Sequence, residues 1–256
     1  MNKPDFIIIG SMKCGTTVLW HNLNKHPDIE MIKNPEDPKK ASTEIRFWNN
    51  GQPHRTFNKG IEWYFSLFNK SFCGEKCANY IENKNTMKKI HDNIDKIKLV
   101  LCVREPVDRA YSEFRMQFPN ATEDKFNFNS IKKNGYSNRS KYFSLIEENI
   151  LPFFRKEDLY IIVQEEMKKN TDNELNKLYK FLGVSEFHLD TNTVSSELAT
   201  NRNLDLEKDK KIKSYKVWNS KYKPMNPELK KILKDYFLFE NKKLFNFLGY
   251  EIKDWR

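Results

Sequence analysis

The sequence lacks a long apolar run, a cysteine framework and a metal-ligand spacing of histidines. None of its stretches is apolar for long enough to cross a membrane or has the form of a signal peptide, so we expect a cytoplasmic protein with no membrane partner. The four cysteines show no disulfide pattern, and Cys73 and Cys77 lack the second pair that a zinc site needs. The five histidines show no ligand spacing, and we therefore expect no metal.

The excess of positive charge is large but is not gathered in one segment. Lys and Arg number 45 against 35 Asp and Glu, which gives a net charge of +10. Such a balance permits a nucleic acid, an anionic surface or an anionic cofactor as partner. Because the lysines are spread along the chain and no RNA- or DNA-reading signature is present, we assign the charge to attraction of a multiply anionic nucleotide and expect no nucleic-acid partner. A basic nucleic-acid-binding protein is the alternative of a different class.

Apolar segments of strand length alternate with segments of helical periodicity along the chain. We expect strands at residues 6–9, 29–32, 72–78, 98–103 and 159–163. We expect helices at residues 17–25, 61–67, 84–95, 142–154, 173–182 and 227–248, and one that begins at Pro106. Residues 118–138 are irregular and rich in Asn, a candidate lid. The alternation predicts an α/β fold in which a parallel sheet carries helices on both faces, and with no repeat or linker residues 1–256 are expected to form a single domain.

Residues 7–17 hold the most informative pattern of the chain. An Ile-rich strand runs into a loop between Gly10 and Gly15, and a helix begins near Thr16. Such a turn gathers backbone N–H groups at a helix N-terminus, which suits a phosphate. The glycine spacing is that of a nucleoside-triphosphate P-loop, but Thr16 stands where that motif has its lysine, and Lys13 lies inside the loop instead. This arrangement favours a shorter 5′-anion with no obvious need of metal, and the alternative is an ordinary tight turn.

A second anion-binding pattern follows the fourth expected strand. Arg104 comes directly after this strand, and a proline then opens a helix that carries Ser112. The planar fork of an arginine suits a phosphate because it donates two parallel hydrogen bonds. Ligands of parallel sheets bind at the carboxyl ends of strands, and both Lys13 and Arg104 are expected there. The alternative is a salt bridge from Arg104 to Glu105 or Asp108.

Residues 13–17 and 99–112 resemble the 5′-phosphosulfate loop and the 3′-phosphate segment of sulfotransferases that use 3′-phosphoadenosine 5′-phosphosulfate (PAPS). Residues 241–255 also resemble the end of the heparan-sulfate-type branch of that family. The resemblance implies a P-loop-like α/β fold and in-line transfer of a sulfuryl group from PAPS to a hydroxyl or amine, which leaves adenosine 3′,5′-bisphosphate (PAP). It implies a small-molecule or saccharide acceptor, and some bacterial relatives act in natural-product biosynthesis.

The resemblance also implies roles for individual residues. Lys13 would stabilise the leaving phosphate, and Arg104 and Ser112 would clamp the 3′-phosphate. Arg109 is expected to be structural. The residues of the loop that would bind the 5′-phosphate with Lys13 are Cys14, Gly15, Thr16 and Thr17. The helix N-terminus could lower the pKa of the Cys14 thiol; the alternative is a small residue that fits the turn.

Glu44 is the expected general base. Residues 42–48 resemble the family segment in which a glutamate deprotonates the acceptor, and the neighbouring Phe47 and Trp48 would raise the pKa of the carboxyl. The alternative is a surface glutamate paired with Arg46. The two residues after Glu44 depart from the aliphatic residue and histidine of the polysaccharide branch, which leaves the type of acceptor open.

Further residues match the family more loosely. Lys76 is either a second cation near the sulfuryl group or a solvated lysine, and Tyr142 is a candidate nucleotide contact. Lys221 and Lys223 would close over the 3′-phosphate, unless their presence reflects only the abundance of lysine. A P-loop nucleotide kinase or other phosphotransferase is the alternative enzyme, disfavoured because no lysine follows Gly15 and no apolar strand ends in a convincing magnesium-holding Asp. The oligomeric state stays open.

Overall fold

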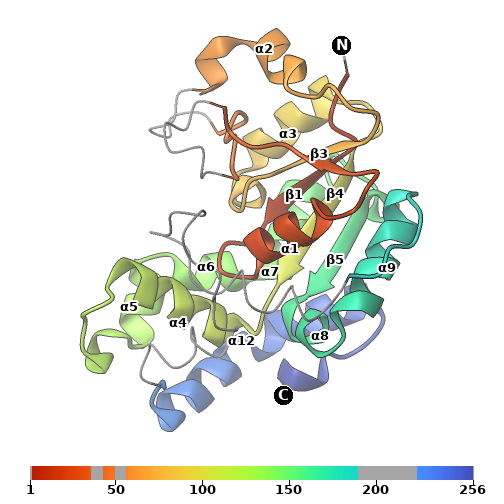
Figure 1. Ribbon diagram of the computed structural model, residues 1–256. Coiled ribbons are helices and arrows are strands. Elements are labelled where there is room, and N and C mark those ends of the chain that lie inside the picture. The colour runs from red at the N-terminus through yellow and green to blue at the C-terminus, as the bar shows by residue number, and fades with distance from the viewer. Residues whose placement is uncertain (1, 36–42, 50–55, 190–223, 256) are drawn as a thin grey trace, which may run out of the picture.

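The computed structural model describes residues 2–35, 43–49, 56–189 and 224–255. The centre of this part of the chain is a sheet of five parallel strands in the order β2-β3-β1-β4-β5 (Figure 1). The strands are β1 Phe6–Gly10, β2 Glu30–Met31, β3 Cys73–Lys76, β4 Lys98–Val103 and β5 Leu159–Val163. Each of them overlaps a predicted strand, and the parallel sheet is confirmed.

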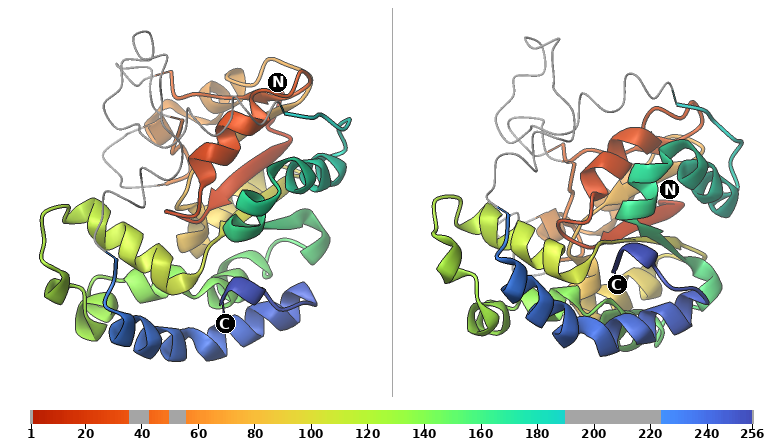
Figure 2. Two further views of the ribbon diagram at one scale, coloured as in Figure 1. Left: turned by 60° about the horizontal axis from the view of Figure 1, so that its bottom comes forward. Right: turned by 90° about the horizontal axis from the view of Figure 1, so that it is seen from below.

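Helices cover both faces of the sheet, as the alternation predicted. α1 and α9 lie on one face, and α3, α7 and α12 lie on the other (Figure 2). The α-helices are α1 Thr16–Leu23, α2 Ile61–Ser66, α3 Lys84–Asn93, α4 Pro106–Gln117, α5 Phe128–Lys133, α6 Tyr136–Ser140, α7 Tyr142–Leu145, α8 Gln164–Lys169, α9 Thr171–Leu182 and α12 Pro227–Leu248. Within the described ranges, none of them combines the length and the apolarity that a membrane span requires.

Capping residues set the ends of the longer helices. At the start of α4 the Glu105 carboxylate accepts the Asp108 N–H, and Pro106 occupies the first turn, where its missing N–H costs nothing. α9 ends at Gly183 with φ 84, and α12 ends at Gly249 with φ 83. Glycine adopts this left-handed conformation readily, and the ends of both helices were therefore predicted correctly.

Two segments differ from their predictions. Residues 118–138 were expected to be irregular, but they contain α5 and part of α6. A capping box at Asn127 starts α5, and Gly135, with φ 71, turns the chain into α6. Residues 142–154 were expected to form one α-helix, whereas α7 is followed by a π-helical turn, η4 Ile146–Ile150. The Asn-rich composition therefore reflects helix caps and turns in this region.

The strand order places several loops at one edge of the sheet. β1 lies between β3 and β4, so three neighbouring parallel strands end side by side. The chain leaves β1 toward β2 and leaves β4 toward β5, in opposite directions. In open α/β sheets this change of direction creates the crevice in which ligands bind. Residues 6–9 and 99–103 are at most 1% exposed, so the strands form a rigid, fully buried support for these loops.

Candidate active site

Glycine is required at the end of the loop that follows β1. Gly15 has φ 86, and a Cβ atom at this position would lie 2.9 Å from Nε2 of Gln164. The left-handed backbone therefore favours glycine, and a larger residue would also have to displace the end of the Gln164 side chain. Lys13 also has a left-handed backbone, with φ 71, and α1 begins at Thr16. The predicted order of strand, tight loop and helix is confirmed.

One buried hydroxyl joins this loop to the turn after β4. The Tyr142 side chain is 2% exposed. Its hydroxyl donates to the Arg104 carbonyl oxygen (2.8 Å), accepts from the Arg104 N–H (3.3 Å) and lies 3.4 Å from Sγ of Cys14. The Ser11 N–H also donates to the Cys102 carbonyl oxygen at 2.8 Å. The Tyr142 hydroxyl thus holds the two segments together, and a contact of this residue with a nucleotide stays a prediction.

The acids proposed as alternative partners of Arg104 are engaged elsewhere. The Glu105 carboxylate accepts the Asp108 N–H at 2.8 Å, and Asp108 pairs with Lys230 at 2.8 Å. Over the residues that the structure describes, the Arg104 guanidinium forms no ion pair. Ser112 lies further along α4 and is partly buried. The turn after β4 thus carries a guanidinium outside any described ion pair, with the Glu165 carboxylate nearby on the Glu105 N–H (3.0 Å).

Arg109 is structural, as expected. Its side chain is fully buried and donates to Oγ of Ser140 (2.5 Å), to the carbonyl oxygen of Tyr136 (2.8 Å) and to the Glu113 carboxylate (2.9 Å). A longer contact of 3.5 Å reaches the carbonyl oxygen of Met12 in the loop after β1. Arg109 therefore supports that loop from the interior of the protein, and its charge is not exposed at the surface.

Lys76 lies inside a polar cluster at the end of β3. Its Nζ donates to Oε1 of Glu44 at 3.0 Å and to Oγ1 of Thr17 at 3.2 Å, and its side chain is 3% exposed. The alternative of a solvated lysine is therefore wrong. A backbone bridge also pairs residues 44 and 76, and the Ala78 N–H donates to the same Glu44 oxygen at 3.3 Å. The cluster brings together three segments that are far apart in the sequence.

The pKa of Glu44 is lowered, contrary to the prediction. Burial alone would raise the pKa of this carboxyl, but the charges and hydrogen bonds of Lys76 and Arg46 outweigh it. Arg46 Nη2 lies 2.9 Å from Oε2 of Glu44, so the predicted alternative pair does form, although Glu44 is only 15% exposed. Phe47 and Trp48 do not surround the carboxyl; both rings pack on Tyr64 in the core.

The Cys14 thiol is protonated at neutral pH. Burial raises the pKa of Cys14 to about 11, against smaller lowering effects from Tyr142, Arg109 and Arg104. The predicted lowering by the helix N-terminus is therefore wrong, and the alternative of a small residue that fits the turn describes the position. All four cysteines are free thiols. In the described ranges no group of His, Cys, Asp and Glu side chains converges as metal ligands do.

The sequence analysis missed α8, which follows β5 at the same edge. Gln164 is 8% exposed, lies against Gly15, and its Oε1 finds no hydrogen-bond partner among the described residues. Burial and the nearby Arg104 charge lower the pKa of Lys168 to about 8. The available signal was positional: residues 164–169 directly follow the strand that neighbours β4. A six-residue helix is too short to show a helical period.

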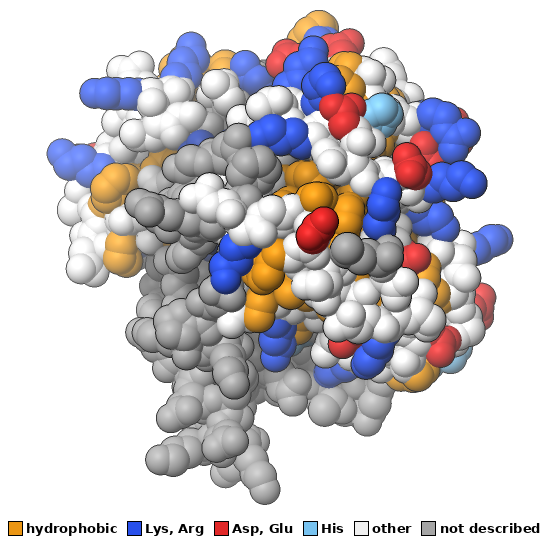
Figure 3. Space-filling model, turned by 90° about the horizontal axis from the view of Figure 1, so that it is seen from above, with side chains coloured by type: hydrophobic (Ala, Val, Ile, Leu, Met, Phe, Trp, Pro, Cys, Tyr) orange, Lys and Arg blue, Asp and Glu red, His pale blue; other side chains and the backbone are white. Residues whose placement is uncertain are grey.

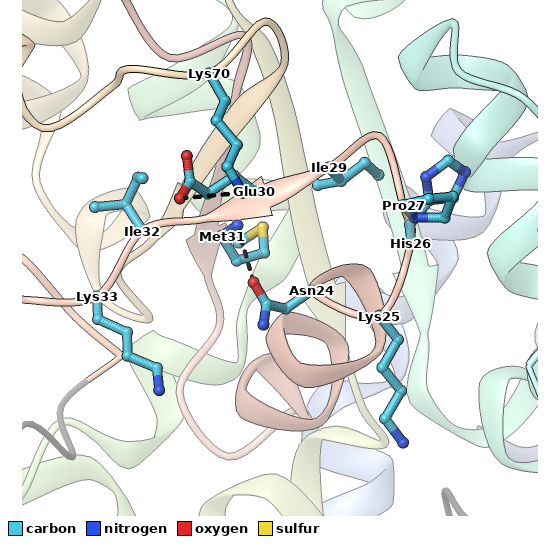
Figure 4. A pocket seen from close by; sticks show the side chains of 10 residues that line it. All are labelled: Asn24, Lys25, His26, Pro27, Ile29, Glu30, Met31, Ile32, Lys33 and Lys70. Carbon is cyan, nitrogen blue, oxygen red and sulfur yellow. Dashed lines mark hydrogen bonds and ion pairs between the residues drawn. The ribbon is translucent and has the colours of Figure 1, made fainter.

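Two predicted site residues and a pocket of the structure remain to be placed relative to this edge. Lys221 and Lys223 lie outside the described residues. One pocket of about 610 Å³ runs along the edge strand β2 and the end of α1 (Figure 4), lined by residues between 24 and 33 and by Lys70. None of the described residues of the candidate site lines it. The candidate site is the carboxyl edge of β1, β3, β4 and β5, where the described candidate residues lie.

Several animal sulfotransferases are similar in sequence to this chain over nearly all of its length. It is 28% identical over 278 residues to the mouse bifunctional heparan sulfate N-deacetylase/N-sulfotransferase 4 and 29% identical over 276 residues to a Caenorhabditis briggsae enzyme of the same name, number 1. Each alignment covers 98% of this chain and 31% of the relative. The chain thus spans less than a third of the length of these relatives.

Solved structures and a family model agree on the fold. A sulfotransferase from Alicyclobacillus acidocaldarius superposes with a TM-score of 0.72 at 20% identity over 100% of both chains. A mouse sulfotransferase in complex with PAP superposes with a TM-score of 0.56 at 17% identity, over 94% of this chain and 86% of the other. The model of the sulfotransferase domain matches residues 3–248. The loop after β1, the arginine turn after β4 and this match lead to one conclusion: the chain belongs to the sulfotransferase family.

Proposed function

We propose that this protein transfers a sulfuryl group from PAPS to a hydroxyl or amine of a small-molecule or saccharide acceptor. One observation carries the proposal: the glycine-framed loop of Lys13 and the turn of Arg104 follow neighbouring parallel strands. A nucleotide with phosphates at both ends of its ribose matches two such sites. We further propose that residues 1–256 form one cytoplasmic sulfotransferase domain, with natural-product biosynthesis as its context.

The nucleotide would be held by residues at both strand ends. Backbone N–H groups and hydroxyls at the start of α1 would bind the 5′-phosphate, and each charge-assisted hydrogen bond contributes about 1.5–3 kcal/mol. Arg104 and Ser112 would bind the 3′-phosphate, with Lys221 and Lys223 completing the clamp. Tyr142 would act indirectly, because its hydroxyl fixes the backbone of Arg104.

The transfer would proceed by in-line displacement. The acceptor atom bonds to sulfur while the bond from sulfur to the 5′-phosphate oxygen breaks, and negative charge grows on that oxygen. Lys13 would stabilise the departing phosphate, and Lys76 would stabilise the sulfuryl oxygens. Glu44 would take the acceptor proton. Because its pKa is lowered, Glu44 is ionised at neutral pH but is a weak base, so we expect the proton to move late, after the acceptor has begun to bond to sulfur.

The two alternatives differ from this proposal in ligand and in metal dependence. A P-loop kinase would prefer ATP with magnesium, and a nucleic-acid-binding protein would bind DNA or RNA in a salt-sensitive manner. On the face shown in Figure 3, Lys and Arg side chains are interspersed with Asp and Glu, which does not favour a nucleic-acid surface there. The relatives that act on heparan sulfate support a saccharide as one candidate acceptor.

Calorimetry and mass spectrometry test the proposal. We expect PAP to bind in the presence of a chelator, more tightly than ATP with magnesium, and we expect Lys13→Ala to weaken or abolish transfer. Incubation with PAPS and a panel of amines, alcohols and saccharides should give a product heavier by one sulfo group. Preference for ATP with magnesium, or nucleic-acid binding that survives Lys13→Ala without any PAP binding, would refute it.

A further inference from the structure

Aromatic side chains anchor the segment that carries Glu44. Phe47 and Trp48, the third and fourth residues after it, are each 2% exposed. The Phe47 ring stacks on Tyr64 with centroids 4.5 Å apart and an interplanar angle of 19°, and the Trp48 ring meets Tyr64 edge-on at 5.0 Å. Tyr64, which is itself fully buried, is therefore one of the anchors of residues 43–49, beside hydrogen bonds from Thr56 to the Ile45 carbonyl oxygen and from Asn49 to Asn79.

A buried carboxyl group fixes this tyrosine and a second one. Glu75 is fully buried. Its Oε1 accepts the Tyr64 hydroxyl at 2.5 Å and the Tyr80 hydroxyl at 3.3 Å. The Tyr80 oxygen in turn accepts the Trp48 N–H at 3.5 Å. Glu75 thus reaches residues 43–49 by two routes, one through a ring stack and one through a backbone hydrogen bond.

β3 contacts the Glu44 segment with side chains from both of its faces. Successive side chains of a strand point to opposite faces, so Lys76 reaches the Glu44 carboxylate while Glu75 points to Tyr64 and Tyr80. We propose that Glu75 is a positioning residue that keeps residues 43–49 in the conformation in which Glu44 meets Lys76. The inference rests on the proposed function, in which Glu44 takes the proton of the acceptor.

Glu75 can serve in this way as an uncharged acid. Burial raises the pKa of Glu75 to about 7, and the charge of Glu44 adds to the effect, whereas the hydrogen bonds from Tyr64 and Tyr80 lower it. Over the described residues no cation pairs with it. Glutamine has the same shape and a carbonyl acceptor, so it should replace Glu75 with little loss. Alanine removes the acceptor to which two buried hydroxyls donate.

The test compares Glu75→Gln, Glu75→Ala and Tyr80→Phe with Glu62→Gln, a control at an exposed glutamate on α2. Hydrogen–deuterium exchange of a peptide covering residues 43–49 reports the anchor without any need for activity. We expect faster exchange in Glu75→Ala and Tyr80→Phe, and wild-type exchange in Glu75→Gln and Glu62→Gln. In the transfer assay Glu75→Ala should lower kcat by about a hundredfold, the scale of a small misplacement of a reacting group, with unchanged PAP affinity, and Glu75→Gln should restore kcat.

The outcomes separate the anchor from the enzyme activity. A folded Glu75→Ala protein with wild-type exchange at residues 43–49 overturns the inference. If Glu75→Ala fails to fold, the double variant Tyr64→Phe/Tyr80→Phe, which removes both hydroxyls that bond Glu75, replaces it, and wild-type exchange there overturns the inference equally. Loss of PAP affinity together with kcat in Glu75→Ala would indicate general damage and also contradict a positioning role. If the wild-type protein neither binds PAP nor transfers a sulfo group, the proposed function fails, whereas exchange still decides whether Glu75 holds the segment.

Discussion

The buried pair of Lys76 and Glu44 makes a quantitative prediction for Lys76→Met. Methionine retains most of the apolar stem of lysine and removes only the charged end. Lys76 is 3% exposed and Glu44 is 15% exposed, so the carboxylate cannot be fully resolvated after the change. Removal of one partner of a buried ion pair costs about 3–5 kcal/mol. Arg46 still pairs with Glu44 at 2.9 Å, and we therefore expect the lower end, about 3 kcal/mol.

A double-mutant cycle measures the pair. Urea unfolding at neutral pH should show that Lys76→Met is strongly destabilising, and that adding Glu44→Gln recovers about 2 kcal/mol of the loss, because the uncompensated charge is then absent. The exposed pair Lys88 and Asp92 provides the control, and Lys88→Met should leave stability unchanged within error. Additive effects of the two site substitutions would refute the coupling.

The same pair sets the pH dependence of stability. The folded-state pKa of Glu44 is lower than the ordinary value of 4.5. Its contribution is therefore fully present above about pH 4.5 and is lost as the pH falls through the folded-state pKa. Lys76→Met removes the largest of the lowering effects, so the stability curves of wild type and variant should converge in acid. A gap of constant size from neutral pH to acid would contradict the assigned charge state.

Three further predictions follow from individual contacts. Lys13→Ala should lower the rate of single-turnover transfer by orders of magnitude, with a smaller effect on PAP affinity, because the charge on the leaving oxygen grows only in the transition state; equal losses in both would refute its role. Tyr142→Phe removes the hydroxyl that bonds the backbone of Arg104, and should cost about 1–2 kcal/mol in thermal unfolding and weaken PAP binding in calorimetry. Because burial raises the pKa of Cys14 to about 11, iodoacetamide should label it far more slowly than an exposed cysteine thiol at neutral pH, and rapid labelling of Cys14 in the folded protein would contradict its burial.

Local features of the sequence were sufficient to locate the two strand-end segments. Gly15 needs a left-handed backbone and free space, and an apolar strand directly precedes the loop. Pro106 and Gly183 mark helix ends for reasons that depend on the residue itself. Because ligands of parallel sheets bind at the carboxyl ends of strands, both Lys13 and Arg104 could be assigned to that end of the sheet, whereas the pairing of β1 with β4 came from the structure.

The properties of the side chains depended on contacts that the sequence does not display. The pKa of Glu44 is governed by Lys76, which is 32 residues away in the sequence, and the prediction relied instead on the adjacent Phe47 and Trp48, which face the core. The hydrogen bonds of Tyr142 could not be predicted from local sequence either, since its partner Arg104 is 38 residues away. Local patterns indicate which residues are present at a site, whereas tertiary contacts determine their charge and orientation.

The charges near the candidate site say more about where an anionic nucleotide would bind than the net charge of +10 does. At the carboxyl edge, Arg104 has no ion-pair partner among the described residues, and together with burial it lowers the pKa of Lys168 to about 8. The charge of Glu165 raises the same pKa, and its carboxylate accepts the Glu105 N–H at 3.0 Å, one residue after Arg104. Lys76 is compensated directly by Glu44. The Arg104 guanidinium therefore lies where the 3′-phosphate is proposed to bind, and the ion pair of Lys76 and Glu44 lies where the chemistry is proposed to occur.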